Sequence, residues 1–368
     1  YLWALVDDGT AAALDEIRDL GLNAISLATH YHSVEHYRPH TRGAFIYRED
    51  SALYFQPELA RYAGTRIRHR VAPLVAKHGN PMQHLAAACA ARGLNLLSWT
   101  LACHSSWIGR TYPDCTQESC FGDRYPEALC PANPEVRGFL KGLVGDLSNN
   151  YGVNLIELES CHFAPSRHFH HHEKLPMPLG ATEHFLLSLC FCKSCTALGT
   201  TAGVDMTQLR AMISIRLRAS FAAGQPERAS VAEVVAQTPG LPAFLAARCT
   251  SINTLMRDLR QASSAPLSPI TWASMETSGL DPAQVAPITD SLTICAYTKD
   301  PAEARRAIRE AAAAAGGAGK LRVGYHCFPP VTPDGETLLK VIAASLEEGV
   351  RAFSFYNYGI APRPCLAW

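Results

Sequence analysis

Two glutamates, Glu157 and Glu159, are the residues of this sequence whose type and spacing best suit acid–base chemistry. They lie in the run NLIELES at 154–160, where apolar and acidic residues alternate. Alternate side chains of a strand lie on opposite faces, so Ile156 and Leu158 share one face and the two glutamates share the other. Two carboxyl groups this close repel each other as anions, which raises one apparent pKa of the pair. The pattern predicts a catalytic Glu159, and it fits Glu157 equally as a substrate-binding or a structural, ion-paired residue.

A second carboxyl group, placed across the scissile bond, is required for most glycoside hydrolysis. Glu276 follows a predicted strand at 269–273, and Asp123 lies in the loop after a predicted strand at 94–100. The predicted catalytic set is therefore Glu159, Glu276 and Asp123. Glu159 would attack the sugar or activate water, and one of the other two would protonate the leaving oxygen. A loop aspartate is also common as a turn former or helix cap, which is the alternative for Asp123.

Aromatic and polar side chains gather after the predicted strands. Aromatic rings there favour a flat, polar ligand such as a sugar, whose C–H faces stack on rings while its hydroxyls take polar partners, although some of these rings are expected to pack the core instead. The predicted substrate-binding residues are Asp7, His30, Trp99, His104, Glu157, His162, His172, Glu173, Tyr297, His326, Tyr356 and Asn357.

Histidines offer an alternative chemistry based on a metal ion. His30 and His32 form an H-x-H pattern at the end of a predicted strand, which places both on one face. A second histidine-rich segment, HFHHHE at 168–173, follows the strand that carries Glu159. Imidazole and carboxylate groups bind catalytic divalent ions, so a metal-dependent reaction is the second hypothesis.

Three cysteines form the most specific short motif of the chain. Cys190, Cys192 and Cys195 have the spacing C-x-C-x₂-C, which places three thiols on a tight turn. A structural zinc site needs four such ligands, and Cys161 or Cys130 would supply the fourth. The motif predicts structural zinc as a cofactor, and three reduced thiols at a helix end are the alternative.

Eight strand-like segments alternate with helical ones along the chain. The strand-like segments are 2–6, 23–29, 94–100, 155–160, 269–273, 291–298, 321–328 and 352–359. Repeated strand–helix units predict an α/β fold of the (β/α)8 TIM-barrel type. A doubly wound open sheet is the alternative, but the first turn, VDDGTAAA, lacks its glycine-rich fingerprint.

Two long insertions interrupt this regular spacing, both after the carboxyl end of a predicted strand. Residues 30–80 follow the second strand, and residues 161–264, which are rich in His, Cys and helical segments, follow the fourth. Barrel enzymes enlarge such loops to build their sites. The prediction is a single domain over 1–368 that carries these two insertions.

The composition of the 368 residues excludes several partners. The 33 basic side chains equal the 33 acidic ones, so no basic surface for nucleic acid or an anionic membrane is expected. No run of about 18 apolar residues is present to span a bilayer. Thirteen cysteines, an odd number with several in apolar runs, favour a reducing, cytoplasmic location. The expected partner is a small carbohydrate, and homo-oligomerisation stays open.

On these residues the chain resembles the (β/α)8-barrel glycoside hydrolases, many of which carry a catalytic carboxylate at the end of the fourth strand, here 155–160. The stretch LCFCKSC at 189–195 is similar to the cysteine cluster of certain barrel β-galactosidases, where it binds structural zinc. The run ALCPANP at 128–134 also looks like loops of glycosidase-like barrel proteins. The resemblance implies hydrolysis of a small glycoside or oligosaccharide.

The seventh predicted strand departs from that resemblance. Its sequence, VGYHCF at 323–328, has no carboxylate where the large retaining clan carries its nucleophile. A fourth-strand nucleophile with a fifth-strand acid, as in amylase-like barrels, fits Glu159 and Glu276 better. Two alternatives remain: a metal-dependent sugar isomerase or hydrolase that uses His30, His32 and Glu159, and a carbohydrate-binding barrel without catalysis.

Overall fold

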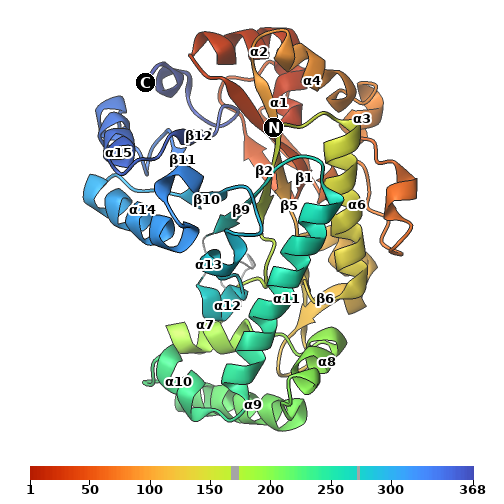
Figure 1. Cartoon of the computed structure of the whole chain (residues 1–368), viewed down its shortest axis with the longest axis vertical. Coiled ribbons are helices and arrows are strands. Elements are labelled where there is room, and N and C mark those ends of the chain that lie inside the picture. The colour runs from red at the N-terminus through yellow and green to blue at the C-terminus, as the bar shows by residue number, and fades with distance from the viewer. Residues whose placement is uncertain (167–173, 272–273) are drawn as a thin grey trace.

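The computed structural model describes residues 1–166, 174–271 and 274–368, and it shows a curled sheet with helices around it (Figure 1). The strands of this sheet are β1 (Ala24–Tyr31), β4 (Ala52–Leu53), β5 (Asn95–Leu101), β8 (Leu155–Glu159), β9 (Leu267–Thr271), β10 (Leu292–Cys295), β11 (Leu321–His326) and β12 (Ala352–Tyr356). Their order in space is β12-β11-β10-β9-β8-β5-β1-β4. Neighbours are parallel, except that β4 runs antiparallel to β1.

The predicted α/β class is confirmed, whereas the first predicted strand is wrong. Residues 2–6 belong to a helix, α1 (Leu2–Asp8), in which Leu2, Trp3, Ala4 and Leu5 are all buried. A short, continuous apolar run fits a buried helix as well as a buried strand, because it has no periodicity that distinguishes them. The eighth strand of the sheet is instead β4, which lies within the 30–80 segment.

The sheet is a half-barrel, not a closed barrel. Within the described part of the chain, β12 pairs only with β11, and β4 forms the opposite end of the sheet order. Tyr1 spans the space between the two sides. Its hydroxyl lies 3.0 Å from that of Tyr31 on β1 and 3.1 Å from that of Tyr356 on β12. Three tyrosine hydroxyls therefore connect the sides that the backbone leaves unpaired.

This open edge predicts a difference in amide exchange between two strands. Every amide of β8 faces a neighbouring strand, because β8 pairs with both β5 and β9, whereas every second amide of β12 faces the open side. We expect alternate amides of β12 to exchange much faster than those of β8, as unpaired backbone groups do. Hydrogen exchange followed by NMR would measure this, and uniform protection along β12 would mean that another segment pairs with it.

Helices cover the outer face of the sheet and form a group beyond one end of it (Figure 1). They are α1, α2 (Thr10–Asp19), α3 (Pro73–Lys77), α4 (Met82–Ala90), α5 (Ser106–Thr111), α6 (Pro134–Asn150), α7 (Ala181–Leu187), α8 (Lys193–Thr201), α9 (Met206–Ala223), α10 (Val231–Gln237), α11 (Leu241–Ala262), α12 (Met275–Ser278), α13 (Pro282–Val285), α14 (Pro301–Ala315) and α15 (Gly335–Glu347). Side-chain caps set several starts: Asn133 accepts from the amide of Glu135 at α6, and Asp300 accepts from that of Ala302 at α14. No helix in the described ranges is long and apolar enough to cross a membrane.

The chain between β8 and β9 contains the helices α7 to α11. In Figure 1, α7 to α10 lie together at one end of the molecule, and α11 runs from them to the sheet alongside α6. Arg137 on α6 and Asp258 on α11 join the two helices through an ion pair of 3.0 Å. Two hairpins lie outside the main sheet: β2 (Val34–Tyr37) with β3 (Ile46–Glu49), and β6 (Thr116–Glu118) with β7 (Arg124–Leu129).

Candidate active site and cysteine cluster

A cavity of about 710 Å³ lies on the inner face of the curled sheet, and both Glu157 and Glu159 line it. The alternation along β8 explains this arrangement, because Ile156 and Leu158 are buried on the opposite face. Among the described lining residues, these two glutamates are the carboxylates.

Glu159 has the environment of a proton donor. The indole Nε1 of Trp99, on the neighbouring strand β5, donates a hydrogen bond to its Oε2. Burial raises the pKa of the Glu159 carboxyl from 4.5 to about 7, the Trp99 hydrogen bond lowers it, and the nearby charge of Glu157 raises it. Desolvation favours the neutral form of an acid, so a substantial fraction of Glu159 is protonated at neutral pH.

Glu157 is held deeper by polar partners on two other strands. The Ser26 hydroxyl on β1 donates to its Oε2, and Nε of Arg322 on β11 lies 3.5 Å from its Oε1. The carboxylate is 5% exposed, so these two contacts replace solvent around it. Arg322 itself lines the cavity, and nothing in the sequence analysis identified it, because its role depends on a pairing across the sheet.

Aromatic rings form the wall of the cavity near Glu159. The ring centroids of Trp99 and Tyr356 are 5.8 Å apart at 83°, and those of Tyr297 and Tyr356 are 6.2 Å apart. Tyr297 is 44% exposed, so its ring is accessible to a ligand. Of the predicted substrate-binding residues, the structure places Trp99, Glu157, Tyr297, Tyr356 and Asn357 on the cavity.

Other lining residues were missed by the sequence analysis, notably Tyr1, Tyr31 and Cys295. Tyr1 was missed because the first segment was expected to be a strand. Cys295 has a signal in the sequence, since it stands two residues after Thr293 on β10 and both line the cavity. Burial is the largest factor that raises the pKa of Tyr31 and Tyr356, so their hydroxyls stay neutral and can donate hydrogen bonds.

His30 does not lie on the cavity, although His32 does. The pairing of β1 with β5 shifts register between Ala28 and His30, which changes the face on which His30 lies. β1 ends at Tyr31, so His32 lies beyond the strand and does not follow its alternation. The ring of His30 is buried 5.7 Å from that of Phe139 on α6, and its Nδ1 bonds to the Leu101 carbonyl. Burial lowers the pKa of His30 to about 4, so it is neutral. Of the two histidines, only His32 therefore faces the cavity.

Three further residues that were predicted to bind substrate, His104, His326 and His162, do not line the cavity. The ring of His104 stacks on that of His32 at 4.8 Å, and the ring of His326 lies 5.2 Å from that of Tyr297. Both therefore contact lining residues without lining the cavity themselves. His162 is buried, with Nδ1 2.8 Å from the Phe163 carbonyl oxygen.

Asp7 and the two predicted partner acids lie elsewhere. Asp7 is on α1 and forms an ion pair of 2.6 Å with Arg38. Glu276 is in the first turn of α12, directly after the β9 segment, and does not line the cavity. Asp123 is in the β6–β7 turn and lines a separate pocket with Arg218. His172 and Glu173 lie outside the described residues.

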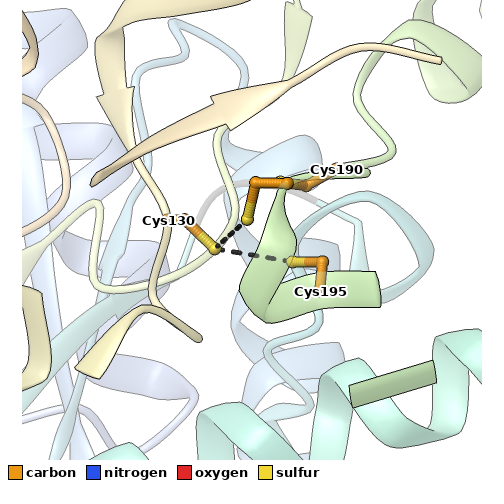
Figure 2. A group of neighbouring side chains, drawn as sticks. Cys130, Cys190 and Cys195 are labelled. Atoms are coloured by element: carbon orange, nitrogen blue, oxygen red, sulfur yellow. Dashed lines mark hydrogen bonds between the residues drawn. The ribbon is translucent and has the colours of Figure 1, made fainter. Parts of the chain in front are cut away.

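Four buried cysteines form a second cluster, three of them in the connection between β8 and β9 and one directly after β7. The ligand atoms of Cys130, Cys190, Cys192 and Cys195 all lie within 4.8 Å of one another. The Cys130 sulfur is 3.4 Å from that of Cys195 and 3.5 Å from that of Cys192. Figure 2 shows Cys130 pointing toward the segment that carries Cys190 and Cys195. All thirteen cysteines of the chain are free thiols.

Of the two candidates for the fourth ligand, the structure places Cys130 in this cluster and not Cys161. Cys130 directly follows β7, and the backbone N–H of Phe191 donates to the Glu118 carbonyl of β6 at 2.7 Å. This contact joins the β6–β7 hairpin, which Cys130 follows, to the segment that begins at Cys190. Cys130 and Cys190 are 60 residues apart, so sequence spacing alone could not select Cys130 over Cys161. Cys161 is buried separately, and burial raises the pKa of its thiol to about 12.

The geometry of the cluster fits a tetrahedral metal ion. Zinc bound to four thiolates at about 2.3 Å places the sulfurs about 3.8 Å apart, close to the separations found here. Cys192 is the N-cap of α8, where helix N–H groups favour a thiolate, and Cys195 lies in the first turn of the same helix. Hydrogen bonds from the neighbouring thiols hold the pKa of Cys192 below its usual range. Among the described residues, no other His, Cys or carboxylate group forms such a cluster.

Solved structures similar to this chain include glycoside hydrolases. The PgaB (BpsB) glycoside hydrolase domain from Bordetella bronchiseptica aligns with a TM-score of 0.56 and 13% identity, over 95% of this chain and 87% of that one. The catalytic domain of β-amylase from Paenibacillus polymyxa gives 0.54 and 12%, over 97% and 92%. The chain has a glycoside hydrolase-like fold in which the eight-stranded sheet forms a half-barrel.

A β-galactosidase from the psychrophilic Marinomonas ef1 is similar as well, with a TM-score of 0.55 and 9% identity over 95% of this chain. The chain spans about half, 51%, of the length of that protein. At these identities the likeness shows the fold alone. No family model matches the chain, and no curated protein sequence matches it.

Proposed function

We propose that this protein is a glycoside hydrolase that cleaves a small glycoside or oligosaccharide, with Glu159 as its general acid. The observation that carries the proposal is the environment of Glu159, whose pKa is raised to about 7 on an aromatic-lined cavity. A general acid works best when its pKa is near the working pH. The fold shared with glycoside hydrolases supports this reaction class.

The proposed chemistry begins with protonation of the glycosidic oxygen by Glu159. The rings of Trp99, Tyr297 and Tyr356 would stack on the sugar, and Asn357 and the tyrosine hydroxyls would bind its hydroxyl groups. The Glu157 carboxylate, paired with Arg322, faces the same cavity and would stabilise the positive charge that develops on the sugar ring. This assigns Glu159 the opposite role from the nucleophile or base expected from sequence.

Among the described cavity residues, no third carboxylate is present to act as the nucleophile or water-activating base. Glu276 and Asp123 do not line the cavity, so neither is proposed to contact the sugar directly. A barrel that binds carbohydrate without cleaving it is the second candidate, and the observation that favours it is that both described cavity carboxylates come from one strand, β8. The metal-dependent sugar isomerase or hydrolase is not proposed, because His30 lies away from the cavity.

The direct test is a screen for reducing-sugar release from oligosaccharides and from nitrophenyl glycosides, combined with equilibrium binding of the same sugars. Hydrolysis of at least one substrate supports the proposal. Saturable binding without any release of reducing sugar after long incubation would instead support the binding barrel.

The pH dependence of that hydrolysis should follow the titration of Glu159. A general acid must be protonated, so kcat is expected to fall as the pH rises through about 7, the pKa of this carboxyl. A profile of kcat from pH 5 to pH 9 on one substrate would measure it. A rate that instead rises through this range would assign Glu159 the role of base.

We also propose that the four-cysteine cluster holds a structural zinc ion, which would fix the β6–β7 hairpin to the start of α8. No sugar-binding or catalytic role is assigned to this ion, because the cluster is formed by residues that do not line the cavity.

A further inference from the structure

Arg248, on α11, is a buried cation without a carboxylate partner in the part of the chain that the structure describes. Its side chain is 0% exposed. Nη1 donates to the Glu276 carbonyl at 3.1 Å and Nη2 to the Thr277 carbonyl at 2.6 Å, while Nε has no hydrogen-bond partner. A buried charge costs several kcal/mol unless an opposite charge compensates it. The positive charge of Arg248 therefore requires a negatively charged group nearby.

The position of α11 places Arg248 beside the four-cysteine cluster. The ring of Phe244 on α11 lies 6.1 Å from that of Phe191, which stands between Cys190 and Cys192. Arg248 follows Phe244 by four residues, so both occupy the same face of the helix. Its guanidinium also lies 4.3 Å from the centre of the Phe163 ring, which fixes it in place.

Cysteine sulfurs surround the buried guanidinium of Arg248. Burial lowers the pKa of Arg248, and the groups that oppose this shift are Cys195 and Cys190, followed by Cys249 and Cys130, so three of the four sulfurs of the cluster lie within electrostatic range of it. Four thiolates around a divalent ion leave two net negative charges, which are equally unfavourable when buried alone. The positive charge of Arg248 and the net negative charge of the metal-loaded cluster would therefore compensate each other.

We propose that Arg248 is the counter-charge of the metal-loaded four-cysteine cluster and strengthens its hold on the ion. The inference depends on metal binding at the cluster and is independent of the glycosidase proposal. It also gives the side chain a second role. Because the same guanidinium holds the carbonyls of Glu276 and Thr277, it connects the cluster to α12, the segment that follows β9.

The test compares zinc affinity in four proteins: wild type, Arg248→Met, Arg248→Lys and Arg137→Met. Zinc affinity is measured by competition with a chromogenic chelator. We expect Arg248→Met to bind zinc about 10- to 100-fold more weakly, the usual effect of losing a group that supports metal ligands. Arg248→Lys keeps the charge and should stay within a few-fold of wild type. Arg137→Met is the matched control, because Arg137 is paired with Asp258 and should not affect zinc binding.

A second readout separates charge compensation from packing. In the metal-free protein Arg248 loses its compensating charge, so Arg248→Met should be more stable to urea than wild type. With zinc bound, the order should reverse. Equal zinc affinity of wild type and Arg248→Met would overturn the proposal, and so would equal losses in Arg248→Met and Arg248→Lys. A wild-type chain that binds no zinc would overturn it too, without bearing on glycoside hydrolysis.

Discussion

Replacement of Glu159 by glutamine is expected to lower kcat by about 10²- to 10⁴-fold, the usual contribution of a general acid. Glutamine keeps the size of the side chain but has no proton to transfer to the leaving oxygen. The loss should depend on the leaving group. A nitrophenolate leaves without protonation, so its glycosides should lose much less activity than an oligosaccharide with an alkoxide leaving group.

The same substitution has a predicted effect on stability, with a definite sign. The folded-state pKa of Glu159 lies above its ordinary value, at about 7 against 4.5, so ionisation opposes folding as the pH rises through this interval. A shift of this size corresponds to about 3 kcal/mol once the group is fully ionised. Glu159→Gln removes that cost, so the variant should be at least as stable as wild type at pH 8. Urea unfolding at pH 4 and pH 8 measures the difference.

Glu157→Gln is the matched control on the same strand. It leaves Arg322 without its acidic partner, and a broken buried pair costs about 3 kcal/mol. The two identical chemical changes should therefore shift stability in opposite directions at pH 8. Near-full turnover of an oligosaccharide by folded Glu159→Gln would remove the proposed role of this residue.

The site was predictable from sequence where it depended on local alternation. Glu157 and Glu159 share a face because β8 alternates without interruption, and the same rule applies to Thr293 and Cys295 on β10. The rule failed at His30, since the register shift in β1 changes which residues face inward. A shift of this kind depends on pairing with β5, which the sequence of β1 alone does not encode.

Contacts between distant segments account for the other differences between the sequence-based predictions and the structure. The pairing of Arg322 with Glu157 and the position of Cys130 in the cysteine cluster both join residues from separate elements. Seven of the predicted strands occur in the described sheet, because each is a short apolar run after a helix. The run at 2–6 has the same composition, but its neighbours in space make it a buried helix. Composition identified the apolar segments, and tertiary packing decided the structure of the ambiguous one.

Replacement of Cys130 by serine is expected to remove most of the zinc from the cysteine cluster. The sequence motif contains three of the four thiols, and Cys130 is the member supplied by the hairpin. Without it a tetrahedral site loses one ligand, so the zinc content should fall well below one ion per chain. Elemental analysis of the purified protein measures this directly, with Cys161→Ser as the control.

Zinc binding and folding are linked, so the same variant should also unfold more readily. An ion present at about 1,000 times its Kd stabilises the folded state by about 4 kcal/mol, and Cys130→Ser should lose most of that. Addition of a strong chelator should destabilise wild type and Cys161→Ser but have little further effect on Cys130→Ser. If Cys161→Ser loses zinc while Cys130→Ser retains it, the fourth ligand is Cys161, the other candidate from the sequence, and not Cys130. If the chelator leaves wild type unchanged, the four thiols stabilise the fold through packing alone.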